Sequence, residues 1–68
     1  MNLCALRTKA GLTQTEVAKK LNVTQSAVAM WENGRTYPRT LILKKLAELY
    51  KCTVDELLKE DQGEGAEE

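Results

Sequence analysis

The chain has 68 residues, of which 43% are hydrophobic, and its ten basic residues balance ten acidic ones. This length allows one small domain with a limited core, so helix packing or dimerisation must supply part of the stability. The sequence contains no apolar run long enough to span a bilayer, no histidine and only two cysteines, and residues 1–25 lack the charged, apolar and small-residue pattern of a signal peptide. We therefore expect a cytosolic protein that has no metal site or cofactor and keeps its thiols reduced.

Capping and turn residues predict two short helices in the first third of the chain. The first spans residues 2–10 and ends at Gly11. The second begins with a capping box, in which Thr13 and Glu16 can satisfy each other's backbone N–H groups. Asn22 tolerates the left-handed conformation, so the chain can turn sharply into a third helix and form a helix-turn-helix. The apolar faces of the first two helices are Leu3, Leu6 and Ala10, then Val17, Ala18 and Leu21.

The third predicted helix follows Thr24, a good N-cap, and stops at Asn33-Gly34. With Val28 as the buried direction and about 100° per residue, Thr24, Trp31 and Glu32 face inward. The opposite face carries no charge, and its amide, hydroxyl, methyl and thioether groups suit the major groove of DNA. A solvated surface helix has the same periodicity, but the preceding helix and turn favour DNA reading. The residues of this outer face and the first turn are Gln25, Ser26, Ala29, Met30 and Asn33.

Two more helices are predicted in the rest of the chain. Thr40 can cap the fourth, and Thr53 with Glu56 forms a second capping box for the fifth. From Glu60 onward glycine and acidic residues dominate, so we expect a helix-turn-helix domain over residues 1–60 and a disordered acidic tail over residues 61–68. The inner stripe predicted for the fourth helix consists of Ile42, Leu43, Leu46, Ala47 and Tyr50. The apolar set of the fifth helix is Val54, Leu57 and Leu58.

Charge is segregated along the chain although it sums to zero. Residues 1–45 include eight basic and two acidic residues, whereas residues 46–68 include two basic and eight acidic ones. Such asymmetry is typical of a protein with one phosphate-facing side. Because surface charge also keeps any small domain soluble, the segregation rather than the net charge is the signal.

Together these segments resemble the phage-repressor and Cro type, also called the xenobiotic-response-element type, of DNA-binding domain. The resemblance covers roughly residues 2–59. It implies a compact all-α, five-helix, lambda-repressor-like fold whose second and third helices form the helix-turn-helix, and which usually acts as a dimeric transcriptional regulator. The motifs that carry it are Leu12-Thr13-Gln14, Val17-Ala18-Lys19-Lys20-Leu21, Val23-Thr24-Gln25-Ser26, Trp31-Glu32-Asn33-Gly34, Pro38, Leu46-Ala47 and Val54-Asp55-Glu56-Leu57-Leu58.

Glu32 needs a cation, because an unpaired carboxylate on the inner side of a helix carries a large desolvation cost. Arg7, at the edge of the first helix's apolar stripe, is the best candidate. In the resembled family an arginine at this place pairs with the glutamate of the Trp-Glu-Asn-Gly turn. We therefore expect a structural ion pair and assign Arg7 no contact with DNA.

The expected roles at DNA divide into positioning and reading. Gln14 opens the second helix, where free N–H groups suit a phosphate, and its side chain could lean toward Gln25. Tyr37 is suited either to the DNA backbone or to packing against Pro38. We expect base reading by Gln25 above all, then by Ser26, Ala29, Met30 and Asn33, and phosphate contacts by Gln14, Arg35, Thr36, Tyr37 and Arg39.

Two positions depart from the family's pattern. Leu41 lies about half a turn off the core stripe, where the family is often polar. With Leu49, Leu57 and Leu58 it predicts an apolar patch for a second subunit. Lys51 stands where a glycine C-cap is frequent, so we expect the fourth helix to end less sharply.

Two functions remain open. One is a sequence-specific regulator, acting as a repressor, that binds double-stranded DNA as a homodimer on an inverted repeat. The alternative is a small helical protein-interaction or antitoxin-like module that kept the fold without reading DNA. An enzyme is not expected, because histidine, a glycine-rich phosphate loop and a paired nucleophile and base are all missing from the sequence.

Overall fold

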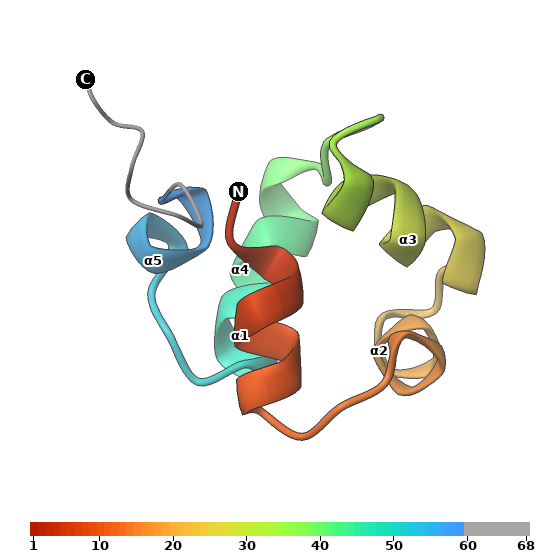
Figure 1. The fold of residues 1–68 in the computed structure, drawn as a ribbon, viewed down its shortest axis with the longest axis horizontal. Coiled ribbons are helices and arrows are strands. Elements are labelled where there is room, and N and C mark those ends of the chain that lie inside the picture. Colours follow the sequence, from red (N-terminus) through yellow and green to blue (C-terminus); the bar gives the residue numbers. More distant parts are fainter. Residues whose placement is uncertain (60–68) are drawn as a thin grey trace.

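The computed structural model describes residues 1–59, and within that range it contains five helices and no strand. They are α1 (Leu3–Lys9), α2 (Gln14–Leu21), α3 (Gln25–Asn33), α4 (Thr40–Leu49) and α5 (Val54–Leu58). Figure 1 shows α1 in front of α4, with α2 and α3 on one side and α5 on the other. The predicted all-α, five-helix fold is confirmed. The tail predicted over residues 61–68, and the domain end at residue 60, lie outside the described residues.

Threonine side chains start three of the helices. The hydroxyl oxygens of Thr13, Thr24 and Thr53 each accept a hydrogen bond from the backbone N–H three residues later, at 3.0–3.1 Å. In α2 and α5 the glutamate side chain returns a bond to the threonine N–H, which completes both predicted capping boxes. Each such cap contributes about 1 kcal/mol.

Three local predictions were wrong. Thr40 is the first helical residue of α4 rather than its cap, because the extended backbone of Arg39 already occupies the N-cap position. Ala10 is exposed rather than on the core face, because α1 ends one residue before it. Thr24 is exposed rather than inward, because its side chain bonds to the backbone of α3's first turn.

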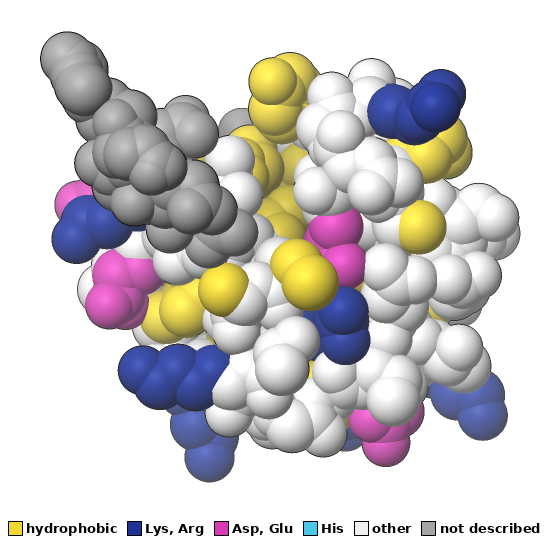
Figure 2. All heavy atoms as spheres, in the orientation of Figure 1, with side chains coloured by type: hydrophobic (Ala, Val, Ile, Leu, Met, Phe, Trp, Pro, Cys, Tyr) yellow, Lys and Arg dark blue, Asp and Glu magenta, His cyan; other side chains and the backbone are white. Residues whose placement is uncertain are grey.

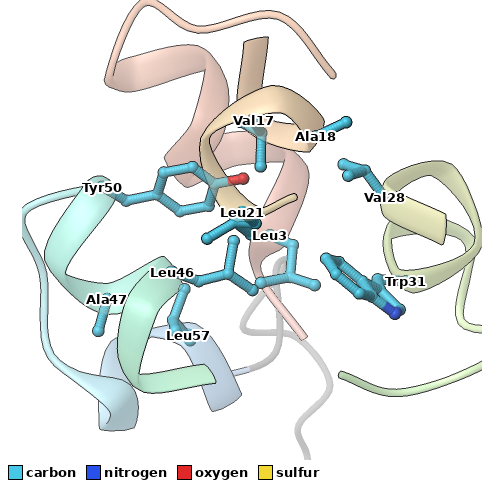
Figure 3. Close-up of a cluster of buried hydrophobic side chains, with 10 residues drawn as sticks. All are labelled: Leu3, Val17, Ala18, Leu21, Val28, Trp31, Leu46, Ala47, Tyr50 and Leu57. Atoms are coloured by element: carbon cyan, nitrogen blue, oxygen red, sulfur yellow. The ribbon is translucent and has the colours of Figure 1, made fainter. Parts of the chain in front are cut away.

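All five helices, together with Tyr50 directly after α4, contribute to one apolar core. Figure 3 shows Leu3 and Leu46 side by side between Trp31 and Leu57. Burying a side chain of this size stabilises the fold by about 1.5–3 kcal/mol. The buried residues are Leu3, Val17, Ala18, Leu21, Val28, Trp31, Leu46, Ala47, Tyr50 and Leu57.

The two leucines at the end of α5 are not equivalent. Leu57 is fully buried in the core, whereas Leu58 is 48% exposed. Buried as it is, Leu57 is not available to the predicted subunit interface, whereas Leu58 is. The cause is that neighbouring residues of a helix project about 100° apart, so only one of the two side chains points into the core.

Four helices end with the same arrangement, in which a left-handed residue follows the last turn. At α4, Cys52 N–H bonds to Ala47 carbonyl at 2.9 Å and Lys51 N–H to Glu48 carbonyl at 3.2 Å. This is the Schellman pattern, so the expectation that α4 ends less sharply was wrong. The left-handed residues after α1, α2, α3 and α4 are Gly11, Asn22, Gly34 and Lys51, with φ of 77°, 59°, 78° and 57°.

Lys51→Gly is expected to raise the free energy of unfolding by about 0.5–1 kcal/mol. A lysine held left-handed carries about 1–2 kcal/mol of steric strain, which glycine's greater freedom in the unfolded chain only partly offsets. Urea denaturation monitored by circular dichroism measures the change. Lys44→Gly, inside the exposed face of α4, is the matched control and should lower stability by about 1 kcal/mol. Destabilisation by both glycines would contradict strain at Lys51.

Among residues 1–59, no helix combines the length and the apolar character that a membrane crossing requires.

Candidate nucleic-acid interface

Helices α2 and α3 form the predicted helix-turn-helix. Asn22 takes the left-handed conformation, with φ 59°, and Val23 N–H bonds back to Ala18 carbonyl at 3.0 Å, so the chain turns sharply within three residues. Val17 of α2 and Val28 of α3 are both essentially inaccessible, at 0% and 1% exposure. The shared buried side fixes α3 on α2 and leaves its opposite side free.

The open side of α3 has the uncharged character that the sequence predicts. Gln25, Ser26, Met30 and Asn33 are exposed, and Ala29 is half-buried. In Figure 2 the surface over α3 is mostly white, the colour of neutral polar side chains and backbone. This face offers hydrogen-bonding amides and a hydroxyl with no charge among them, a composition that fits base edges better than phosphates.

Beside this face, the structure brings Arg7 and Glu32 together. Arg7 Nε donates to Glu32 Oε2 at 2.7 Å and Nη2 donates to Oε1 at 3.3 Å. A third donor, Nη1, bonds to Leu12 carbonyl at 2.8 Å, a contact the sequence did not indicate. The side chains are 16% and 6% exposed, so the pair is largely withdrawn from water. The Arg7 side chain thus links α1 and Leu12, which lies just before α2, to the end of α3.

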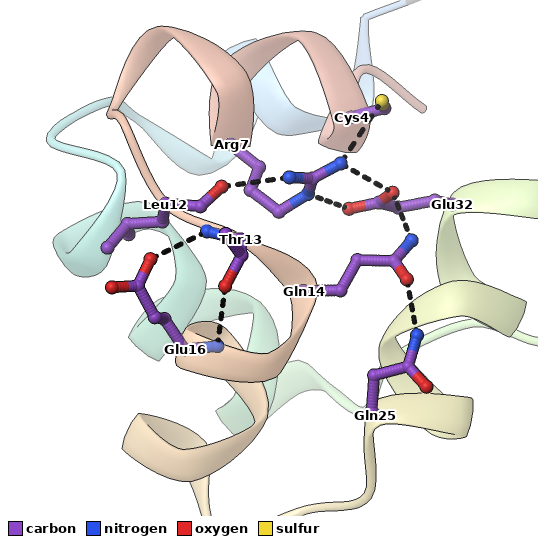
Figure 4. A network of polar contacts seen from close by, with 8 residues as sticks. All are labelled: Cys4, Arg7, Leu12, Thr13, Gln14, Glu16, Gln25 and Glu32. Carbon is purple, nitrogen blue, oxygen red and sulfur yellow. Dashed lines mark hydrogen bonds and ion pairs between the residues drawn. The ribbon is translucent and has the colours of Figure 1, made fainter.

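The ion pair continues into a row of two glutamine amides (Figure 4). Gln14 Nε2 donates to Glu32 Oε1 at 2.8 Å, and Gln25 Nε2 donates to Gln14 Oε1 at 2.6 Å. The lean of Gln14 toward Gln25 was anticipated, but its bond to Glu32 was missed. No sequence signal could reveal that bond, because it joins residues 18 apart on two helices whose relative placement must be known.

Two titratable groups near Glu32 have shifted pKa values. The hydrogen bond and the charge of Glu32 raise the pKa of Arg7, against the opposing effect of burial. Burial, and then the negative charge of Glu32, raise the pKa of the Tyr50 hydroxyl above its usual range. The Arg7 guanidinium therefore stays protonated and the Tyr50 hydroxyl stays neutral at physiological pH.

The loop after α3 carries the predicted phosphate contacts. Arg35, Thr36, Tyr37 and Arg39 are all exposed, while Pro38 is buried. Tyr37 is 70% exposed, so its ring is accessible to a partner. Gln14, the remaining residue of this set, is half-buried because its amide is engaged in the network.

The two cysteines differ in exposure. Cys4 is exposed and its Sγ lies 3.5 Å from Arg7 Nη2, whereas Cys52 is partly buried, and both are free thiols. Burial, and then the charge of Glu56, raise the pKa of Cys52. In the described part of the chain, residues 1–59, no three His, Cys, Asp or Glu side chains are grouped as a metal ion would require.

Residues 5–57 match the family model described as helix-turn-helix. The HTH-type transcriptional activator BcrR of Enterococcus faecalis is 42% identical over 53 residues, which are 78% of this chain and 26% of that protein. The HTH-type transcriptional regulator ImmR of Bacillus subtilis is 41% identical over 56 residues, 82% of this chain and 44% of that one. An uncharacterized HTH-type transcriptional regulator of Archaeoglobus fulgidus is 31% identical over 51 residues, which are 75% of this chain and 73% of that protein. The chain thus spans less than half the length of the two bacterial relatives. No solved structure matches it.

Proposed function

Because this chain belongs to the Cro/C1-type helix-turn-helix family, we propose that it binds double-stranded DNA in a sequence-specific way and regulates transcription. The observation that carries the proposal is the exposed, uncharged face of α3, with Gln25 held at its first turn by Gln14. A domain seated in the major groove of a promoter can exclude other proteins without further contacts, so we propose repression as the mode of regulation.

Helix α3 would enter the major groove with its N-terminal end. Gln25 is exposed and is the first residue of α3, where a glutamine can bond both N6 and N7 of adenine. Ser26 and the methyl group of Ala29 would contact neighbouring base edges, and Met30 and Asn33 would extend the contact along the groove.

Gln25→Ala is expected to lower specific affinity by about 1–3 kcal/mol, because a bidentate base contact is lost. The melting temperature should hardly change, since Gln25 lies outside the core. Titrations of two fluorescent duplexes measure the effect. One carries a site selected for binding from a random pool, and the other carries the same bases in scrambled order. An equal loss on both duplexes would exclude Gln25 as a base reader.

Arg35→Ala, by contrast, is expected to weaken binding to every duplex alike. Arg35 is exposed directly after α3, where the chain would reach the DNA backbone. Losing one phosphate contact should reduce the slope of log affinity against log salt by about one. A slope equal to the wild type's would remove Arg35 from the phosphate contacts.

We also propose that the protein acts as a homodimer on an inverted repeat. Leu41 is 63% exposed at the start of α4 and Leu58 is 48% exposed at the end of α5. Figure 2 shows hydrophobic side chains at the surface over the start of α4. Leu41 also borders an open depression of about 360 Å³ that is lined by Tyr37, Pro38 and Ile42 among others. Leu49, half-buried, would contribute at the margin.

Selection of bound sequences from a random duplex pool, followed by footprinting, tests binding, palindromy and half-site spacing together. Enrichment of one motif supports the proposed function. Binding with no enrichment, or no binding at all at low salt, would favour the alternative of a helical protein-interaction module.

A further inference from the structure

The row of hydrogen bonds from Arg7 to Gln25 has a direction. An arginine side chain only donates hydrogen bonds, and an ionised glutamate only accepts them. Glu32 Oε1 therefore requires the NH₂ group of Gln14, at 2.8 Å, which turns the Gln14 carbonyl oxygen toward α3. That oxygen in turn requires the NH₂ group of Gln25, at 2.6 Å. Each amide orientation is dictated by the one before it, starting from a charge.

The direction of the row determines which hydrogen-bonding groups of the Gln25 amide remain free for a partner. One N–H of its amide is used on Gln14, so its carbonyl oxygen and the second N–H remain for a partner. One acceptor beside one donor matches adenine, which presents an N6 donor and an N7 acceptor in the major groove. Guanine presents two acceptors there, and a Gln25 turned the other way would offer its whole NH₂ group to them.

We propose that Glu32 is a positioning residue for base reading, which acts through Gln14 to orient the Gln25 amide and so makes adenine preferred over guanine. The inference rests on the proposed function, because Gln25 must face a base. Glu32 itself touches no DNA, since its side chain is only 6% exposed and is covered by Arg7 and Gln14.

Glu32→Gln reverses the row with almost no change of shape. The new amide can keep its oxygen on Arg7 Nε, where Oε2 now lies at 2.7 Å, and this places NH₂ where Oε1 now faces Gln14. The longer contact of Arg7 Nη2 with Oε1, at 3.3 Å, is given up. Gln14 must then present its oxygen to residue 32 and its NH₂ to Gln25, which turns the Gln25 amide over. Gln14→Met interrupts the row instead, while it leaves the Arg7 and Glu32 contact in place. Glu48→Gln, exposed on α4, removes the same charge with no contact to the network.

The experiment measures competition between duplexes that carry adenine or guanine at the base read by Gln25, for the wild type, the three variants and Gln25→Ala. We expect the wild type and Glu48→Gln to prefer adenine by about ten- to hundredfold. Glu32→Gln should lose or invert this preference, and Gln14→Met should weaken it without inversion. Circular dichroism first establishes that Glu32→Gln, in which Arg7 faces a neutral amide, is folded at the temperature of the measurement. The proposal would be overturned if Gln25→Ala abolished the preference for adenine while Glu32→Gln and Gln14→Met kept it. The proposed function would still stand in that case.

A second readout needs no DNA. The side-chain amide signals of Gln25 in the ¹H–¹⁵N spectrum of the free protein should shift in Glu32→Gln and Gln14→Met and stay in place in Glu48→Gln. Unchanged Gln25 signals in the first two variants would overturn the proposal even in a protein that proved not to bind DNA.

Discussion

Arg7→Met is expected to lower the free energy of unfolding by about 3–5 kcal/mol, because it leaves the Glu32 carboxylate buried and unpaired. Glu32 is 6% exposed, and the Gln14 amide that remains beside it carries no compensating charge. A domain of this size commonly has only about 3–5 kcal/mol in total. The variant should therefore be partly or wholly unfolded at 25 °C, as urea denaturation followed by circular dichroism will show.

Two further variants distinguish a buried charge from a lost contact. Arg7→Met with Glu32→Leu removes both charges, and should recover most of the stability because an apolar pair of similar volume fills the site. Arg35→Met changes an exposed arginine in the same way and should stay within about 0.5 kcal/mol of wild type. If Arg7→Met unfolds at the same urea concentration as Arg35→Met, the pair is solvated and contributes about 1 kcal/mol or less.

What the sequence could predict here was local chemistry. Thr13 and Glu16 stand three residues apart, so their reciprocal bonds follow from the helix itself and need no knowledge of the fold. The Arg7 and Glu32 contact was accessible for a different reason. A carboxylate on a buried helix face demands a cation, and few cations lie on a neighbouring apolar stripe.

What it could not predict depends on how helices sit on one another. Leu57 and Leu58 are separated by about 100° on a helix, and only the placement of α5 decides which one the core accepts. Lys51 has no intrinsic preference for the left-handed region. Its conformation is set by the turn from α4 to α5, where Cys52 N–H closes on Ala47. The Gln14 and Glu32 bond likewise needs α2 and α3 already in place.

Five base pairs inserted between the two half-sites are expected to abolish cooperative binding. In the proposed homodimer both copies of α3 enter successive major grooves, so the half-site centres should lie about 10 base pairs, or about 34 Å, apart. Five extra base pairs turn one half-site by about half a helical turn, out of reach of a rigid dimer. Affinity should then fall to that of one half-site, a loss of about a hundredfold or more, because the second contact is no longer intramolecular. Gel-shift titrations of the two duplexes measure it.

Leu41→Glu should have the same effect on the unaltered site, because it places a carboxylate in the apolar patch where two subunits would meet. Leu41 is 63% exposed in the single chain, so the substitution does not touch the core and the monomer should keep its melting temperature. Thr8→Glu adds the same charge at an exposed position on α1 and serves as the control for repulsion by DNA. Sedimentation should show Leu41→Glu as a monomer at micromolar concentration and Thr8→Glu as a dimer. A wild type that is itself monomeric there, with binding unaffected by the insertion, would refute the palindromic dimer and leave a monomeric reader in which a single copy of α3 selects the site.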